Sequence, residues 1–146
     1  YGHSSPFGDR SRTWAASNEP GEAIIAKRGP VYGGEPGDWY LAPGLFGRKS
    51  KTLAIHGRAG EWSGNVAYND LRVVFELEPD PKTLTYVFRN YDDPTQRDNI
   101  FVNEDDARAV PAQPDQRPGI GANALLRSYK NVRREGSFIL VDPFWD

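Results

Sequence analysis

The segment Asn90–Arg108, NYDDPTQRDNIFVNEDDAR, concentrates residues that could bind a cation, since it contains six carboxylates. Calcium takes six to eight oxygen ligands, often from carboxylates on a loop. The spacing does not fit an EF-hand, because Phe101 stands where the bidentate glutamate is required. Asp, Asn and Pro also favour turns, for backbone reasons alone. We therefore predict two solvated turns around a short strand, and the alternative is a calcium site formed by Asp92, Asp93 and Asp98.

Four aromatic residues in or beside glycine-rich turns are the second group that could bind a ligand: Trp39, Tyr40, Trp62 and Tyr68. Exposed rings can stack on sugars, and Trp and Tyr are also enriched at protein interfaces. The third interpretation is that these rings fill a core that is short of aliphatic residues. Trp14, Phe144 and Trp145 lie near the two ends of the chain and are candidate anchors for a protein partner.

Nucleophilic and metal catalysis have little support in the residue types. The chain has two histidines and no cysteine, so thiolate chemistry and a three-histidine zinc site are excluded. No nucleophile elbow, P-loop or dinucleotide fingerprint is present. A glycosidase needs two carboxylates at a defined separation, and Glu61 and Glu76 are the least arbitrary pair. We expect a non-catalytic chain, with a carboxylate-dependent hydrolase as the least favoured alternative.

The size and charge of the chain further limit the class of protein to which it can belong. Its 146 residues fit one domain, and its net charge of −2 gives no strong field of one sign. A nucleic-acid partner is therefore not expected, and no apolar run is long enough to span a bilayer. Position 1 is Tyr. We expect a processed chain that is secreted, displayed at the cell surface or located in an organelle.

The elements that must position these residues are mostly strands. Residues 71–78 and 83–89 both alternate apolar and polar, and the four residues PDPK between them favour a turn, which predicts an antiparallel hairpin. Helical spacing of apolar residues predicts a helix over 123–135, ended by Gly136. Shorter strands are expected within 22–28, 38–42, 51–58, 65–68, 99–103 and 137–142.

This pattern predicts an all-β fold, mainly an antiparallel β-sandwich or barrel, with one short C-terminal helix and long irregular loops. Residues 1–21 are expected to form an irregular arm, and residues 22–146 a single β-rich domain. Three long segments rich in Gly and Pro or without periodicity stand out: 1–21, 29–50 and 104–122.

These long segments guide the functional prediction. Ordering them costs about 1–2 kcal/mol per residue in backbone entropy, which a modest core cannot easily offset. They are expected to gain order against a partner. We therefore expect a structural or assembly subunit that docks on other protein subunits or on copies of itself, without a cofactor. The alternative is a carbohydrate-binding β-sandwich module, with calcium as its only expected ion.

Overall fold

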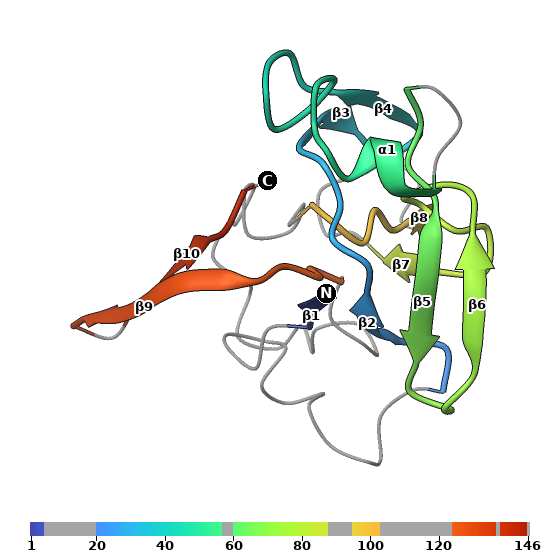
Figure 1. Ribbon diagram of the computed structural model, residues 1–146. Helices are drawn as coiled ribbons and strands as arrows, with labels where there is room; N and C mark the ends of the chain where they lie inside the picture. Colours follow the sequence, from blue (N-terminus) through green and yellow to red (C-terminus); the bar gives the residue numbers. More distant parts are fainter. Residues whose placement is uncertain (5–19, 57–59, 88–94, 103–123, 137, 146) are drawn as a thin grey trace.

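The computed structural model describes residues 1–4, 20–56, 60–87, 95–102, 124–136 and 138–145 (Figure 1). Ten strands and one short helix form this part of the chain: β1 (Gly2–His3), β2 (Ala23–Ala26), β3 (Tyr32–Glu35), β4 (Asp38–Leu41), α1 (Leu53–His56), β5 (Gly64–Tyr68), β6 (Val73–Glu76), β7 (Thr85–Val87), β8 (Thr95–Arg97), β9 (Tyr129–Glu135) and β10 (Phe138–Pro143). Every strand pair in these ranges is antiparallel. The predicted all-β antiparallel class is therefore confirmed.

The largest sheet has four strands in the order β1-β2-β5-β6. Side chains alternate between its two faces, so the face carrying Ala26, Val66 and Tyr68 is buried. On the opposite face Ile25 aligns with Ala67, which aligns with Val73, and both Ile25 and Val73 are exposed. The described strands therefore leave an apolar row on the outer face of this sheet.

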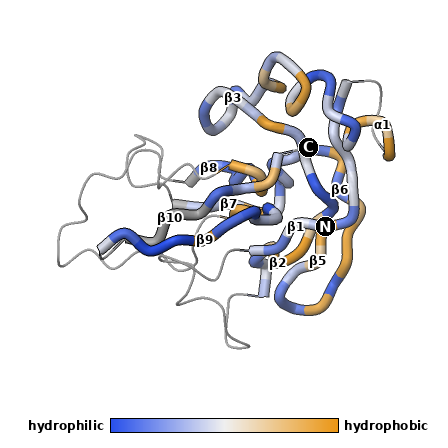
Figure 2. The backbone as a smooth tube through the Cα atoms, turned by 60° about the vertical axis from the view of Figure 1, so that its left-hand side comes forward, coloured by the Kyte–Doolittle hydropathy of each residue, from blue (hydrophilic) through white to orange (hydrophobic). Residues whose placement is uncertain are grey.

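Three two-stranded sheets complete the described strands: β3 with β4, β7 with β8, and β9 with β10. The β9–β10 hairpin projects away from the body of the molecule in both overall views (Figures 1 and 2). Apart from Val132, β9 is largely hydrophilic (Figure 2), and its residues from Lys130 to Glu135 are exposed.

The core is small and depends on aromatic rings. Trp62 packs its ring edge-to-face against Phe101, with centroids 4.9 Å apart, and Tyr32 stacks on Phe101 from another side. Gly29 permits this packing, because a Cβ there would lie 2.3 Å from the Phe101 ring. The buried hydrophobic cluster contains Ala23, Ala26, Leu53, Trp62, Val66, Tyr68, Leu84, Ile100, Phe101, Ala124 and Leu126.

A buried arginine ties three distant segments together across this core. Arg127 is only 4% exposed, and its guanidinium donates hydrogen bonds to the carbonyl oxygens of Gly29, Pro30 and Phe101. The same group lies over the rings of Phe101 and Trp145, at 5.1 and 4.7 Å from their centroids. Because a guanidinium has five donors in one plane, a single side chain can satisfy several buried carbonyls at once.

The predicted helix over 123–135 is wrong, since Tyr129–Glu135 forms strand β9 and pairs with β10. Gly136, which the sequence suggested as the end of a helix, has a φ of +61° and lies in the turn between the two strands. A left-handed glycine serves both as a helix C-cap and as a hairpin turn residue. Local sequence therefore left the two outcomes open, and pairing with the apolar strand Phe138–Pro143 decided between them.

The predicted hairpin between 71–78 and 83–89 is also wrong, although both segments contain strands. β6 pairs with β5, and β7 pairs with β8. The β5–β6 connection is built on the loop 69–71, in which Leu71 adopts a φ of +68°. Such a loop commonly ends with a left-handed residue, usually glycine, which is absent here. The hairpin signal was therefore weak in the sequence.

Two further strand predictions do not hold. Residues 53–56 form the single helical turn α1 rather than a strand, and the chain turns at 100–101 after strand β8 instead of forming a strand over 99–103. The strands expected within 22–28, 38–42, 65–68 and 137–142 are confirmed as β2, β4, β5 and β10. At the start of the predicted arm, β1 pairs with β2 of the same chain, so residues 2–3 belong to the main sheet.

Candidate functional site

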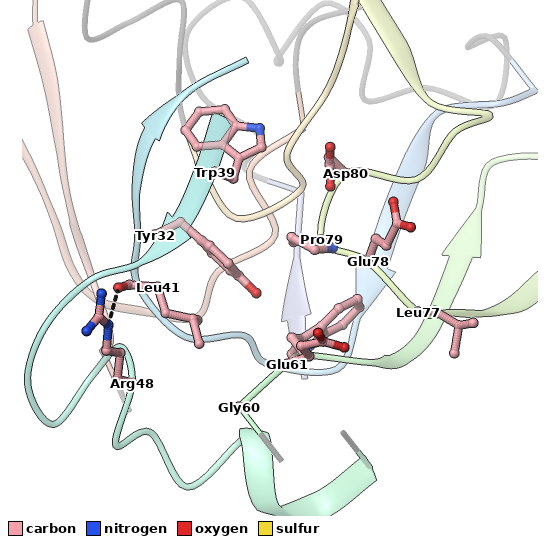
Figure 3. Close-up of a pocket in the computed structure, with 11 residues that line it drawn as sticks. Tyr32, Trp39, Leu41, Arg48, Gly60, Glu61, Leu77, Glu78, Pro79 and Asp80 are labelled. Atoms are coloured by element: carbon pink, nitrogen blue, oxygen red, sulfur yellow. Dashed lines mark hydrogen bonds between the residues drawn. The ribbon is translucent and has the colours of Figure 1, made fainter. Parts of the chain in front are cut away.

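An open cleft of about 700 Å³ lies between the β3–β4 hairpin and two segments from the middle of the chain (Figure 3). Tyr32, Trp39 and Leu41 line it from the hairpin, and residues of the 60–62 and 77–80 segments line the rest together with Arg48. This volume falls in the range of small-molecule sites. Figure 3 shows the Tyr32 hydroxyl pointing toward the Glu61 side of this space.

The four aromatic residues predicted to bind a ligand have different positions. Trp39 is half-buried and lines the cleft, whereas Tyr40, the next residue of β4, points to the other side of that strand and is exposed. Trp62 also lines the cleft but is only 1% exposed, while Tyr68 is fully buried. Neither Trp62 nor Tyr68 therefore offers an open ring face to a ligand.

The indole nitrogen of Trp39 is a buried donor that has no acceptor among the described residues. By contrast, the indole nitrogen of Trp62 donates to the carbonyl oxygen of Arg28 at 3.1 Å. A buried N–H without an acceptor costs about 1–3 kcal/mol, so such groups are rare in folded proteins. Figure 3 shows the nitrogen edge of Trp39 turned toward the Asp80 side of the cleft.

Carboxylates line the wall of the cleft opposite the β3–β4 hairpin. Arg97 on β8 holds two of them, because its guanidinium contacts Glu78 and its Nε lies 3.3 Å from Asp80 Oδ2. Burial raises the pKa of the Asp80 carboxyl, and the nearby Arg97 charge opposes that rise. Burial also raises the pKa of the Tyr32 hydroxyl, which therefore stays protonated at neutral pH. The wall thus offers acceptors, and the hydroxyl adds one donor.

The sequence predicts only part of this site. It singles out Trp39 and Glu61 but not Tyr32, Glu78 and Asp80, since each of these lies in a turn or on a strand with no distinguishing motif. Glu76, the other carboxylate considered for a hydrolase, accepts a hydrogen bond from the Tyr68 hydroxyl at 2.6 Å and does not line the cleft.

The predicted anchors near the chain ends are only partly described. Trp14 lies outside the described residues. Phe144 and Trp145 follow β10 and contact cations of their own chain: Arg28 and Lys130 lie near the Phe144 ring, and Arg127 lies over Trp145. Their role as contacts for a partner stays a prediction.

Most of the acidic stretch, including Asp92 and Asp93, lies outside the described residues. Asp98 is described and is buried, with its Oδ2 accepting the backbone N–H of Ala124 at 2.6 Å. Among the described residues, no three acidic or histidine side chains gather closely enough to hold a metal ion. The geometry at Asp98 is that of a side chain that ties two segments of the core together.

We expect Asp98→Asn to lower the free energy of unfolding by about 1–3 kcal/mol, because it weakens a charge-assisted hydrogen bond to Ala124. Replacing Asp92 and Asp93 together by Asn should change the free energy of unfolding only slightly. Thermal unfolding with and without millimolar calcium, followed by circular dichroism, measures both effects. We expect calcium to leave the melting temperature unchanged, and a rise of several degrees would establish a cation site instead.

Strand β6 is the second candidate site, because it forms an edge of the main sheet. Apolar side chains on this strand are exposed to solvent, as Val73 is 64% exposed and Phe75 47% exposed. In the described part of the chain, no strand pairs with β6 on the side away from β5. Figure 2 shows hydrophobic segments along the β5–β6 hairpin.

Comparisons with protein-family models, with curated proteins and with solved structures find no match to this chain. Within the described residues, no helix combines the length and the apolar composition that a membrane span requires. The chain is thus defined as an antiparallel β protein with a cleft and an apolar sheet edge, and its function has to be inferred from these two features.

Proposed function

We propose that this chain is a non-catalytic structural subunit that assembles with a second copy of itself through strand β6. The observation that carries the proposal is the exposure of apolar residues along one sheet edge. Natural edge strands are usually protected by charges, prolines or bulges, because an open edge pairs readily with another strand. The exposed residues of this segment, which we call the β6 edge, are Leu71, Val73, Val74, Phe75 and Leu77.

Leu71 gives independent support. It is 88% exposed and has a φ of +68°, a left-handed conformation that costs a residue with a side chain about 1 kcal/mol or more. Glycine would adopt it without strain, and an exposed leucine gains nothing from burial within one chain. A partner that covers Leu71 would offset this cost.

The direction of the backbone groups of β6 also suits the addition of a strand. The N–H of Tyr68 donates to the carbonyl oxygen of Arg72 across the β5–β6 ladder. Hydrogen-bonded positions alternate along an antiparallel strand, so Val74 and Glu76 bond toward β5 while the N–H and C=O groups of Val73 point to the opposite side. At Val73 a second strand can therefore add to β6 without breaking the ladder with β5.

The sequence of the β6 edge is self-complementary about Val74. If two copies pair antiparallel with Val74 opposite Val74, Arg72 of each copy faces Glu76 of the other. On the other face Val73 then meets Phe75 and Leu71 meets Leu77. Opposite charges and apolar pairs directly across an antiparallel pair each contribute roughly 0.2–1 kcal/mol. The two-fold pairing closes on itself, so it predicts a dimer in which the main sheets of both copies become one continuous sheet.

Light scattering after size exclusion should give a mass near twice the 16.3 kDa of one chain. Val73→Lys should weaken association by about tenfold or more, because it places like charges beside the pairing edge. The control is Leu45→Lys, which places the same charge on an exposed apolar residue away from the β6 edge. A chain that is monomeric at high micromolar concentration, or a Leu45 variant that dissociates equally, would contradict the proposal.

The register has its own test. Arg72→Glu should dissociate the dimer, because the introduced carboxylate would face Glu76 of the other copy, and adding Glu76→Arg should restore it. Leu71→Gly should raise the stability of the single chain while weakening association, because it removes both the strain and the contact. Failure of the charge exchange, with the fold intact by circular dichroism, would reject this register.

A further inference from the structure

We propose that the cleft between the β3–β4 hairpin and the 77–80 segment binds a neutral, hydroxyl-rich ligand, a saccharide unit of a glycan, with Trp39 and Tyr32 as its principal contacts. The inference does not depend on assembly through the β6 edge. It rests on the mixture of polar groups in the cleft, on its apolar walls and on its charge.

The polar groups include both kinds of hydrogen-bonding partner. The Trp39 indole N–H is a donor that lacks an acceptor in the described part of the chain, and Glu61, Glu78 and Asp80 offer carboxylate acceptors. The Tyr32 hydroxyl can donate as well as accept. A sugar hydroxyl also does both, so it can accept from the indole while a neighbouring hydroxyl donates to a carboxylate. An ammonium ion has donors only and would leave the Trp39 N–H unsatisfied.

The apolar part of the lining suits the C–H faces of a sugar ring. Tyr32 and Trp39 contribute aromatic surface, and Leu41, Leu77 and Pro79 contribute aliphatic surface. Ligand sites typically combine a mainly apolar lining with a few polar groups that fix orientation. This cleft has both, and its volume leaves room for more than one sugar unit.

Charge selects against acidic ligands. Among the described residues, the carboxylates of Glu61, Glu78 and Asp80 line the cleft together with Arg48, whose Nε already donates to the carbonyl oxygen of Leu41. Arg97 adds a positive charge that is held by Glu78 and Asp80. A phosphate or a uronic acid would meet like charges in this lining, and such pairs are unfavourable. A neutral saccharide meets no such penalty.

The indole N–H resonances of the intact chain give a direct test. The chain has four tryptophans, and the Trp39 signal is the one that Trp39→Phe removes. We expect a neutral tetrasaccharide of glucose, mannose, xylose or galactose to shift that signal at about 10 mM, a concentration that detects millimolar affinity. Tetramers of glucuronic acid and of glucosamine, tested in parallel, represent the anionic and cationic alternatives.

Affinity measurements on variants complete the test. Trp39→Phe keeps an aromatic ring but deletes the donor, so we expect about tenfold weaker binding of the neutral tetrasaccharide. Tyr40→Phe changes the neighbouring ring on the other side of β4 and should leave affinity unchanged. Circular dichroism of each variant shows that the fold is retained.

Three results would overturn the inference: no neutral tetrasaccharide shifts the Trp39 signal, the glucosamine tetramer alone shifts it, or Trp39→Phe and Tyr40→Phe weaken binding equally. The first two are read on the wild-type protein, so they decide the question even if a variant does not fold. Binding of a neutral tetrasaccharide to a monomeric protein would support the cleft while removing the assembly proposal, which keeps the two conclusions separable.

Discussion

Replacing Arg127 by alanine should lower the free energy of unfolding by about 3–5 kcal/mol, the largest effect we expect from one substitution outside the core rings. The side chain is buried and donates to the carbonyl oxygens of Gly29, Pro30 and Phe101, which lie 98, 97 and 26 positions away along the chain. Without the guanidinium these oxygens stay buried and lose their donor. Since small domains are stable by about 5–15 kcal/mol, much of the total would be lost.

Urea unfolding followed by circular dichroism measures this loss. Arg127→Met separates the loss of hydrogen bonds from the loss of side-chain volume, because methionine keeps most of the volume but has no donors. We expect this variant to lower the free energy of unfolding by at least about 2 kcal/mol. The matched control is Arg134→Ala on the exposed strand β9, which should change stability by less than about 0.5 kcal/mol. A loss below about 1 kcal/mol for Arg127→Ala would show that water replaces the guanidinium easily.

Replacing Trp62 by alanine should cost about 3–5 kcal/mol, as expected for a large ring removed from a core. Trp62 is 1% exposed, packs on Phe101 and donates its indole N–H to the carbonyl oxygen of Arg28. Trp62→Phe should cost less, about 1–2 kcal/mol, because it keeps a ring and loses mainly the hydrogen bond and some volume.

The assignment of Trp62 to the core is tested by the denaturant midpoints of the two Trp62 variants, compared with that of Tyr40→Ala. Tyr40 is also an aromatic residue beside a glycine-rich turn, but it is exposed, so its removal should change stability by less than about 0.5 kcal/mol. Equal losses at Trp62 and Tyr40 would contradict the division into core and surface rings. Loss of saccharide binding in Trp62→Ala would report on folding and on the cleft lining together, which is why Trp39→Phe is the sharper probe of the cleft.

The pairing of strands shows where local sequence stopped being informative. Alternation in 71–78 and 83–89 correctly predicted a strand in each segment, β6 and β7, yet the partner of each strand came from elsewhere: β5 for β6, and β8 for β7. Alternation fixes which side chains share a face, but it does not select among several strands of similar pattern. For β6, the short loop 69–71 favours pairing with β5, and its left-handed residue is an unusual leucine.

The same limit applies to the two candidate sites. Trp39 could be singled out from its residue type, but its partners in the cleft come from β3, from the 60–62 segment and from the turn after β6. No spacing in the sequence relates these positions. The apolar face of 71–77 was also visible in the sequence, where it suggested one strand of a hairpin. Only the structure shows that, among the described strands, this one lies at a sheet edge.

The sequence by itself determined that this chain is built of antiparallel strands, because period-two alternation and turn residues act over a few neighbouring positions. Tertiary structure alone decided which strands pair, that residues 129–135 extend rather than coil, and that Trp62 is buried while Trp39 lines a cleft. These outcomes depend on contacts between segments far apart in the chain, such as those that Arg127 makes with Gly29 and Phe101. Their energies exceed the small local preferences that a single sequence reveals.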